Sequence, residues 1–94
     1  MAAEDYVMTK LKLGYVGCGF MAQKVHMPNI LLLNDCELAA IAEVRPKLGR
    51  LVQEQFRVPR LYHSHRDLAA DKLIDAVCVS GHFYGQGEIA IDLL

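Results

Sequence analysis

The sequence predicts an α/β fold with an open, doubly wound parallel sheet of about four strands and helices on both faces. Short apolar runs alternate with amphipathic segments along its 94 residues, and this alternation is typical of parallel strands joined by right-handed helical crossovers. Hydrophobic residues make up 53% and charged residues 22% of the chain, as in globular domains. The length allows one domain.

The first half of the chain contains two predicted strands and one interrupted helix. We expect strands at Leu11–Val16 and at residues 37–42, with a turn at Asn34 and Asp35 between them. The helix is expected over residues 20–26. Pro28 lacks an N–H group and should produce a kink or a second short turn.

The second half continues the alternation. Proline at the first helical position predicts a helix over Pro46–Phe56, followed by a short strand at Arg60–Tyr62. Ser64 is the expected N-cap of a helix that runs to about residue 72. Residues 74–80 are the clearest predicted strand, residues 81–87 a glycine-containing loop, and residues 88–94 the start of a final helix.

Composition and spacing exclude several functional classes. The net charge of −1 lacks the basic footprint of a nucleic-acid-binding protein, and no apolar run reaches the length of a membrane span. Three widely spaced cysteines fit the reducing cytoplasm better than a disulfide framework. Residues 1–10 are expected to form a loose leader without the features of a signal peptide.

A glycine motif follows the first predicted strand. Gly17-Cys18-Gly19-Phe20-Met21-Ala22 fits G-x-G-x-x-G/A between a strand and a helix. Gly17 should allow a tight turn, Gly19 a close approach of pyrophosphate, and Ala22 close packing of the helix on the strand. The motif predicts a dinucleotide site in a Rossmann-like sheet, with Cys18 as a small filler and not a reactive thiol.

An acid closes the second predicted strand. Glu43 lies 21 residues after Ala22, near the spacing at which an acid binds the adenosine ribose hydroxyls. Such an acid repels a 2′-phosphate, so NAD is favoured over NADP. Arg45 leaves NADP open, because an arginine there could bind that phosphate or stack on adenine.

The loop after the fourth predicted strand should complete the site. Ligands of open α/β sheets bind beyond the carboxyl ends of strands, which places Ser80, Gly81, His82 and Phe83 near the nicotinamide. A flexible loop is the alternative interpretation. His63 and His65 lack a third nearby metal ligand, so no metal site is expected, and Asp67, Asp71 and Asp75 are expected to be exposed charges.

Together these segments resemble the N-terminal domain of the glucose-fructose oxidoreductase / inositol dehydrogenase / MocA family. The resemblance rests on LKLGYVGCGFMAQKVHMPNI, CELAAIAEVRP and VPRLYHSHRDLAADKLIDAVCVS. It implies that residues 11–94 are a partial Rossmann domain, incomplete relative to six strands. It also implies hydride transfer between a nicotinamide and a hydroxyl-bearing carbon of a sugar or cyclitol, in a protein that could be a homo-oligomer.

The resemblance assigns cofactor-binding roles but no catalytic residue. Gly17, Gly19, Ala22 and Glu43 match family positions, whereas Gly81-His82-Phe83 stands where the family has Thr-Pro-Asn. The family's catalytic Glu-Lys-Pro motif would lie beyond Leu94. Two alternatives remain: a non-catalytic nucleotide-binding or redox-sensing module, and, with less support from the motif, an S-adenosylmethionine-dependent methyltransferase.

Overall fold

A computed structural model of the chain describes residues 10–80. Their strands are β1 (Leu11–Val16), β2 (Cys36–Ala42), β3 (Arg60–Tyr62) and β4 (Ala76–Val79). Their helices are η1 (Ala22–His26), α2 (Met27–Leu31), α3 (Pro46–Phe56) and α4 (His65–Ala69). The predicted loop at 81–87 and helix at 88–94 lie outside the described residues.

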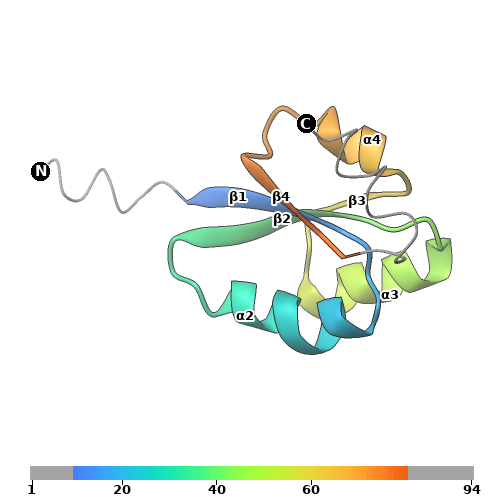
Figure 1. Cartoon of the computed structure of the whole chain (residues 1–94), viewed down its shortest axis with the longest axis horizontal. Helices are drawn as coiled ribbons and strands as arrows, with labels where there is room; N and C mark the ends of the chain where they lie inside the picture. The colour runs from blue at the N-terminus through green and yellow to red at the C-terminus, as the bar shows by residue number, and fades with distance from the viewer. Residues whose placement is uncertain (1–9, 81–94) are drawn as a thin grey trace, which may run out of the picture.

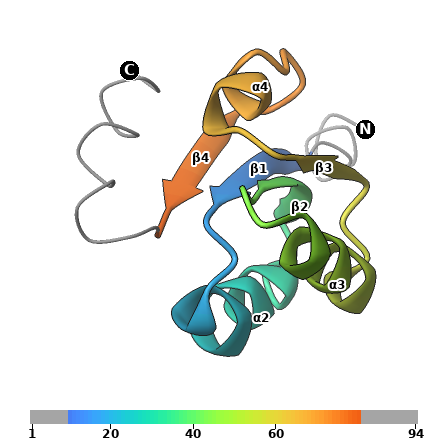
Figure 2. The same cartoon turned by 90° about the vertical axis from the view of Figure 1, so that its right-hand side faces the viewer.

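The four strands form one parallel sheet in the order β3-β2-β1-β4. Helices α2 and α3 lie on one face of the sheet and α4 on the other, as Figures 1 and 2 show. The predicted α/β class, parallel sheet and two-sided helix packing are therefore confirmed. All strands point the same way, so the carboxyl ends of β1 and β2 meet at one edge.

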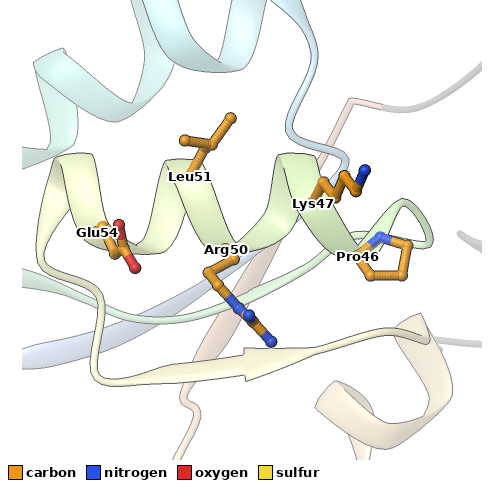
Figure 3. Close-up of a pocket in the computed structure, with 5 residues that line it drawn as sticks. All are labelled: Pro46, Lys47, Arg50, Leu51 and Glu54. Carbon is orange, nitrogen blue, oxygen red and sulfur yellow. The ribbon is translucent and has the colours of Figure 1, made fainter.

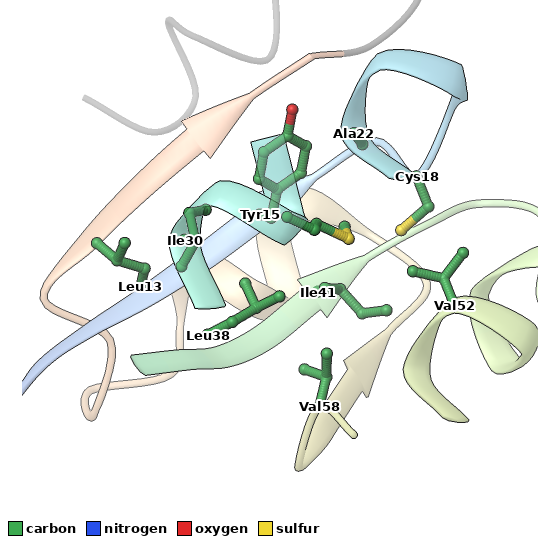
Figure 4. Close-up of a cluster of buried hydrophobic side chains, with 10 residues drawn as sticks. Leu13, Tyr15, Cys18, Ala22, Ile30, Leu38, Ile41, Val52 and Val58 are labelled. Carbon is green, nitrogen blue, oxygen red and sulfur yellow. The ribbon is translucent and has the colours of Figure 1, made fainter. Parts of the chain in front are cut away.

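Each face of the sheet buries its own apolar cluster. Successive side chains of a strand point to opposite faces, and β1 accordingly sends Leu13 and Tyr15 to the larger cluster and Val16 to the smaller one. The larger cluster lies against η1, α2 and α3 (Figure 4); its other buried members are Cys18, Ala22, Met27, Ile30, Leu38, Ile41, Val52 and Val58. The smaller cluster packs under α4 around Leu68, which is fully buried.

The pairing of β1 with β2 contains an irregularity that the sequence did not reveal. Leu13 pairs with Leu38, but Gly14 pairs with Ala40, so one residue of β2 is skipped. Strict alternation would place Leu38 and Ile41 on opposite faces. The shift brings both side chains into the larger cluster.

The helix that contains Pro28 passes this residue without ending. The Met27 N–H donates to the Ala22 carbonyl, five residues back, which makes η1 a π-helical segment. The α-helical pattern follows at once in α2, with Pro28 in its first turn. The predicted second segment is confirmed, and the change of hydrogen-bond pattern accommodates the missing N–H.

Two expectations about the last part of the described chain are wrong. The fourth strand is shorter than predicted and only partly buried, because β4 pairs with β1 alone in the described sheet. Asp71 is not an exposed charge: its side chain is 8% exposed and accepts hydrogen bonds from Arg60 and Tyr62. These partners lie on β3, more than eight residues away, where a local charge pattern cannot reveal them.

The limits of other elements agree with the sequence. Strands β1 and β3 and helix α3 occupy the predicted residues. Ser64 caps α4, because its Oγ accepts the Arg66 N–H at 3.1 Å, although α4 ends at Ala69, before the predicted residue 72. The first turn of α3 begins with Pro46, as predicted.

Candidate functional site

The glycine turn joins β1 to the helix that contains η1. Gly17 has a φ of 94°, and its N–H donates to the Ala42 carbonyl at 2.9 Å. L-residues with side chains rarely adopt this conformation, so the predicted tight turn is confirmed. Ala22 is fully buried against the sheet, which confirms its predicted packing role.

Gly19 lies in a different environment from Gly17. A Cβ atom built on Gly19 would meet no heavy atom within 4 Å among the described residues. Its φ is not positive either, since Gly17 is the positive-φ glycine of the described chain. Neither backbone conformation nor packing of these residues therefore requires glycine here.

Cys18 contributes its backbone to the site and its side chain to the core. The side chain is fully buried in the larger cluster, and Figure 4 shows it among the apolar side chains. Burial, followed by the nearby charge of Glu43, raises the pKa of the Cys18 thiol to about 12. The interpretation of Cys18 as a filler is confirmed, because a neutral thiol is a poor nucleophile.

Glu43 stands directly after β2 and faces the glycine turn. It is 4% exposed, which makes it the most deeply buried charged residue among residues 10–80. Its Oε1 accepts the Cys18 N–H at 2.9 Å, and its Oε2 accepts the Arg45 N–H at 2.9 Å. The predicted acid and the predicted phosphate turn are thus in direct contact, across the neighbouring ends of two parallel strands.

Arg45 completes the environment of this carboxylate. Its Nε donates to Oε2 at 2.9 Å and its Nη2 to Oε1 at 3.0 Å, which makes the pair bidentate. Burial raises the pKa of Glu43, but the hydrogen bonds from Arg45 and Cys18 lower it by more. The net pKa is about 2, against an ordinary 4.5. Glu43 is therefore ionised at neutral pH.

Three contacts near Glu43 escaped the sequence analysis. Nδ1 of His63 lies 3.3 Å from the Glu43 carbonyl oxygen, and the Glu43 N–H donates to the Tyr62 carbonyl at 2.9 Å. On the other side, Gln23 Nε2 donates to the Cys18 carbonyl at 2.8 Å. The loops that follow adjacent parallel strands lie close together. This rule could have predicted the first two contacts, because Glu43 follows β2 and the Tyr62–His63 segment lies at the end of β3.

The remaining predicted residues surround the turn. Phe20 and Met21 are exposed at the start of the helix, Phe20 by 74%. Ser80 follows β4, and its Oγ accepts the Tyr15 hydroxyl at 2.8 Å. Gly81, His82 and Phe83 lie outside the described residues.

Two hollows are lined by residues of the strands and helices around this site. One, of about 320 Å³, includes Tyr15, His26 and Ser80 in its lining. The other, of about 370 Å³, runs along the outer side of α3 (Figure 3) and is lined by Pro46, Lys47, Arg50, Leu51 and Glu54. None of these five residues was predicted to bind a cofactor.

Residues 10–80 contain no group of three or more His, Cys, Asp or Glu side chains that could hold a metal ion. Within the same range, no helix combines the length and apolar character needed to cross a membrane.

Known proteins with similar sequences share this fold. The family described as "Oxidoreductase family, NAD-binding Rossmann fold" matches residues 11–94. A myo-inositol 2-dehydrogenase of Thermotoga maritima is 28% identical over 81 residues, which are 86% of this chain and 24% of the relative.

Solved structures agree with this match. An oxidoreductase from Agrobacterium radiobacter, in complex with NAD+, L-tartaric acid and magnesium, has a TM-score of 0.83 and 30% identity over 89% of this chain and 24% of its own. A myo-inositol dehydrogenase from Lactobacillus casei, in complex with NAD(H) and myo-inositol, shares the fold with a TM-score of 0.84 at 21% identity, over 90% of this chain and 25% of its own. The chain thus spans about a quarter of the length of these proteins.

Proposed function

The chain belongs to the oxidoreductase family with the NAD-binding Rossmann fold, and from this premise we propose that it binds the adenosine and pyrophosphate half of NAD(H). The whole protein would transfer hydride between the cofactor and a hydroxyl-bearing carbon of a sugar- or cyclitol-like molecule. NAD(H) supplies that chemistry by accepting or giving a hydride at its nicotinamide ring. The described residues would bind and orient it.

The observation that carries the proposal is the open space at Gly19. A glycine loses more backbone entropy on folding than any other residue, and neither the φ of Gly19 nor its described neighbours require one. A pyrophosphate that approaches the backbone closely would require it. Gly17 shapes the turn, and Phe20, Met21 and Ala22 begin the helix whose first N–H groups would face the phosphates.

Glu43 supports the choice of NAD over NADP. It is ionised and lies at the carboxyl end of β2, beside the glycine turn. A carboxylate there would accept hydrogen bonds from ribose hydroxyls and would repel a 2′-phosphate. Arg45 lies on the same carboxylate, and its charge is the feature that would favour NADP.

The substrate class rests on the relatives. The Lactobacillus casei enzyme binds myo-inositol, and the Thermotoga maritima relative is a myo-inositol 2-dehydrogenase. We propose a polyhydroxylated small molecule for this protein as well. No catalytic residue is assigned, and Ser80, together with Gly81, His82 and Phe83, would line the nicotinamide side.

The test is an amide NMR titration of the protein with NADH, NADPH and S-adenosylmethionine, repeated on Gly19→Ala. We expect the Gly17 and Gly19 amides to shift at the lowest concentration with NADH. The added methyl group meets no described residue and restricts the unfolded chain, so the free energy of unfolding should not fall and should rise by up to about 1 kcal/mol. It should nevertheless raise the Kd for NADH at least tenfold, or about 1.4 kcal/mol.

Each other outcome has a defined meaning. Tighter binding of NADPH would assign the preference to Arg45 and not to Glu43. A response to S-adenosylmethionine alone would favour the methyltransferase alternative. Dispersed amide signals that no nucleotide shifts would contradict the proposal. Binding of NADH to a protein that oxidises no polyol would favour the redox-sensing alternative.

A further inference from the structure

We propose that the Arg45 guanidinium occupies the ribose-binding position on the Glu43 carboxylate in the free protein. A ribose diol must displace this guanidinium when the cofactor binds. This inference rests on the proposed function, because it takes Glu43 as the group that receives the adenosine ribose. It goes beyond that function by assigning Arg45 a role that opposes cofactor binding.

The acceptor count of Glu43 leaves no room for additional donors. A carboxylate offers about four lone-pair sites, and four donors are present. Oε1 accepts the Cys18 N–H and Arg45 Nη2, while Oε2 accepts the Arg45 N–H and Arg45 Nε, all at 2.9–3.0 Å. The two hydroxyls of a ribose diol can therefore both donate to Glu43 only if two of these donors leave.

The fold determines which donors leave. The Cys18 and Arg45 N–H groups belong to the glycine turn and to the residue before α3, so they are held by the backbone. The Arg45 side chain is 62% exposed, whereas that of Glu43 is 3% exposed. The exposed guanidinium can exchange the carboxylate for water, whereas the two backbone donors cannot, so the guanidinium is the component that leaves.

The exchange conserves the hydrogen bonds of the buried carboxylate. The guanidinium supplies two parallel donors, Nε and Nη2, and the two hydroxyls of a ribose diol also supply two. A buried charge left unpaired is strongly destabilising. Arg45 keeps Glu43 paired in the free protein, and the diol takes over this role in the complex. A nucleotide with one ribose hydroxyl would replace only part of the pair.

The first experiment follows two NMR signals during a titration with NADH, the Arg45 Nε–H and the Gly19 amide. We expect both to shift with the same Kd. NADH that lacks the adenosine 2′-hydroxyl should shift the Gly19 amide and leave most of the Arg45 Nε–H signal at its position in the free protein. If NADH shifts Gly19 while Arg45 stays unchanged, the inference is wrong and the proposed function stands. If neither signal moves, both are wrong.

The second experiment removes the guanidinium. Arg45→Met keeps the aliphatic stem and should lower the Kd for NADH by about two- to fivefold, which corresponds to the strength of an exposed ion pair. Arg50→Met is the matched control, because Arg50 is an exposed arginine of α3 and loses the same charge. Its Kd should not change. An unchanged or higher Kd in Arg45→Met overturns the inference, and the NMR titration of the unmodified protein decides it if the variant does not fold.

Discussion

Glu43 connects three segments that are far apart in the sequence. Its carboxylate accepts the Cys18 N–H of the glycine turn and the Arg45 N–H before α3, and its own N–H donates to Tyr62 of β3. Hydrogen bonds from charged or backbone donors to a buried carboxylate are stronger than neutral ones. The same residue thus links the glycine turn, the start of α3 and β3 by hydrogen bonds, and it presents a charge to the proposed ribose site.

This arrangement predicts a pH dependence of folding. The pKa of Glu43 falls from 4.5 to about 2 on folding, so its contribution is fully present above the unfolded value and is lost as the pH falls toward 2. With allowance for the exposed Arg45, that contribution is roughly 2–3 kcal/mol. We expect Glu43→Gln to flatten the loss of unfolding free energy between pH 6 and pH 3 in urea titrations. Parallel pH profiles of the two proteins would contradict this assignment.

At the scale of elements, close packing of α4 on the sheet depends on Gly14. The smaller cluster contains Leu68 of α4 directly over this glycine of β1. A Cβ atom at Gly14 would lie 2.8 Å from Cδ2 of Leu68 and 3.3 Å from Cγ2 of Ile74. Gly14 therefore serves helix packing, unlike Gly19, whose Cβ position no residue of the range 10–80 contacts.

We accordingly expect Gly14→Ala to destabilise the protein by about 1–3 kcal/mol through overpacking. Leu68→Ala should cost about 2–5 kcal/mol, because Leu68 is fully buried. The double variant should be more stable than the sum of both losses predicts, since the smaller side chain makes room for the added methyl group. Denaturant titration of the four proteins measures this coupling, and strict additivity would show that Gly14 and Leu68 do not share the space.

At the scale of the whole molecule, the sheet order places the proposed site at the carboxyl ends of the strands. The carboxyl ends of β1 and β2 are neighbours, and β4 lies beside β1. The glycine turn, Glu43 and Ser80 follow these three strands. An open α/β sheet binds its ligands at these ends because the loops after its strands converge there.

A ligand that binds only the folded protein stabilises it by mass action. At an NADH concentration of 100 times the Kd, the free energy of unfolding should rise by about 2.7 kcal/mol. Urea unfolding with and without NADH measures the change. Gly19→Ala at the same NADH concentration is the control and should gain clearly less, because its affinity is lower. Equal gains in both proteins would indicate binding away from the glycine turn.

The sequence by itself determined the α/β class, the limits of β1, β3 and α3, and the turn at Gly17. These features depend on local patterns, namely apolar runs, prolines at helix starts, and a glycine where the backbone needs a positive φ. It also indicated the proximity of Glu43 to the glycine turn, through the spacing of the motif. The cofactor roles of these residues stay predictions.

The tertiary structure alone decided the occupation of Glu43 by Arg45, the pairing of Asp71 with Arg60, and the register shift that turns Leu38 and Ile41 to the same face. It also showed that β4 is shorter than predicted and only partly buried. The physical reason is the same in each case. Strand order, register and side-chain pairing depend on contacts between distant segments, and a local pattern specifies which groups are available but not which ones meet.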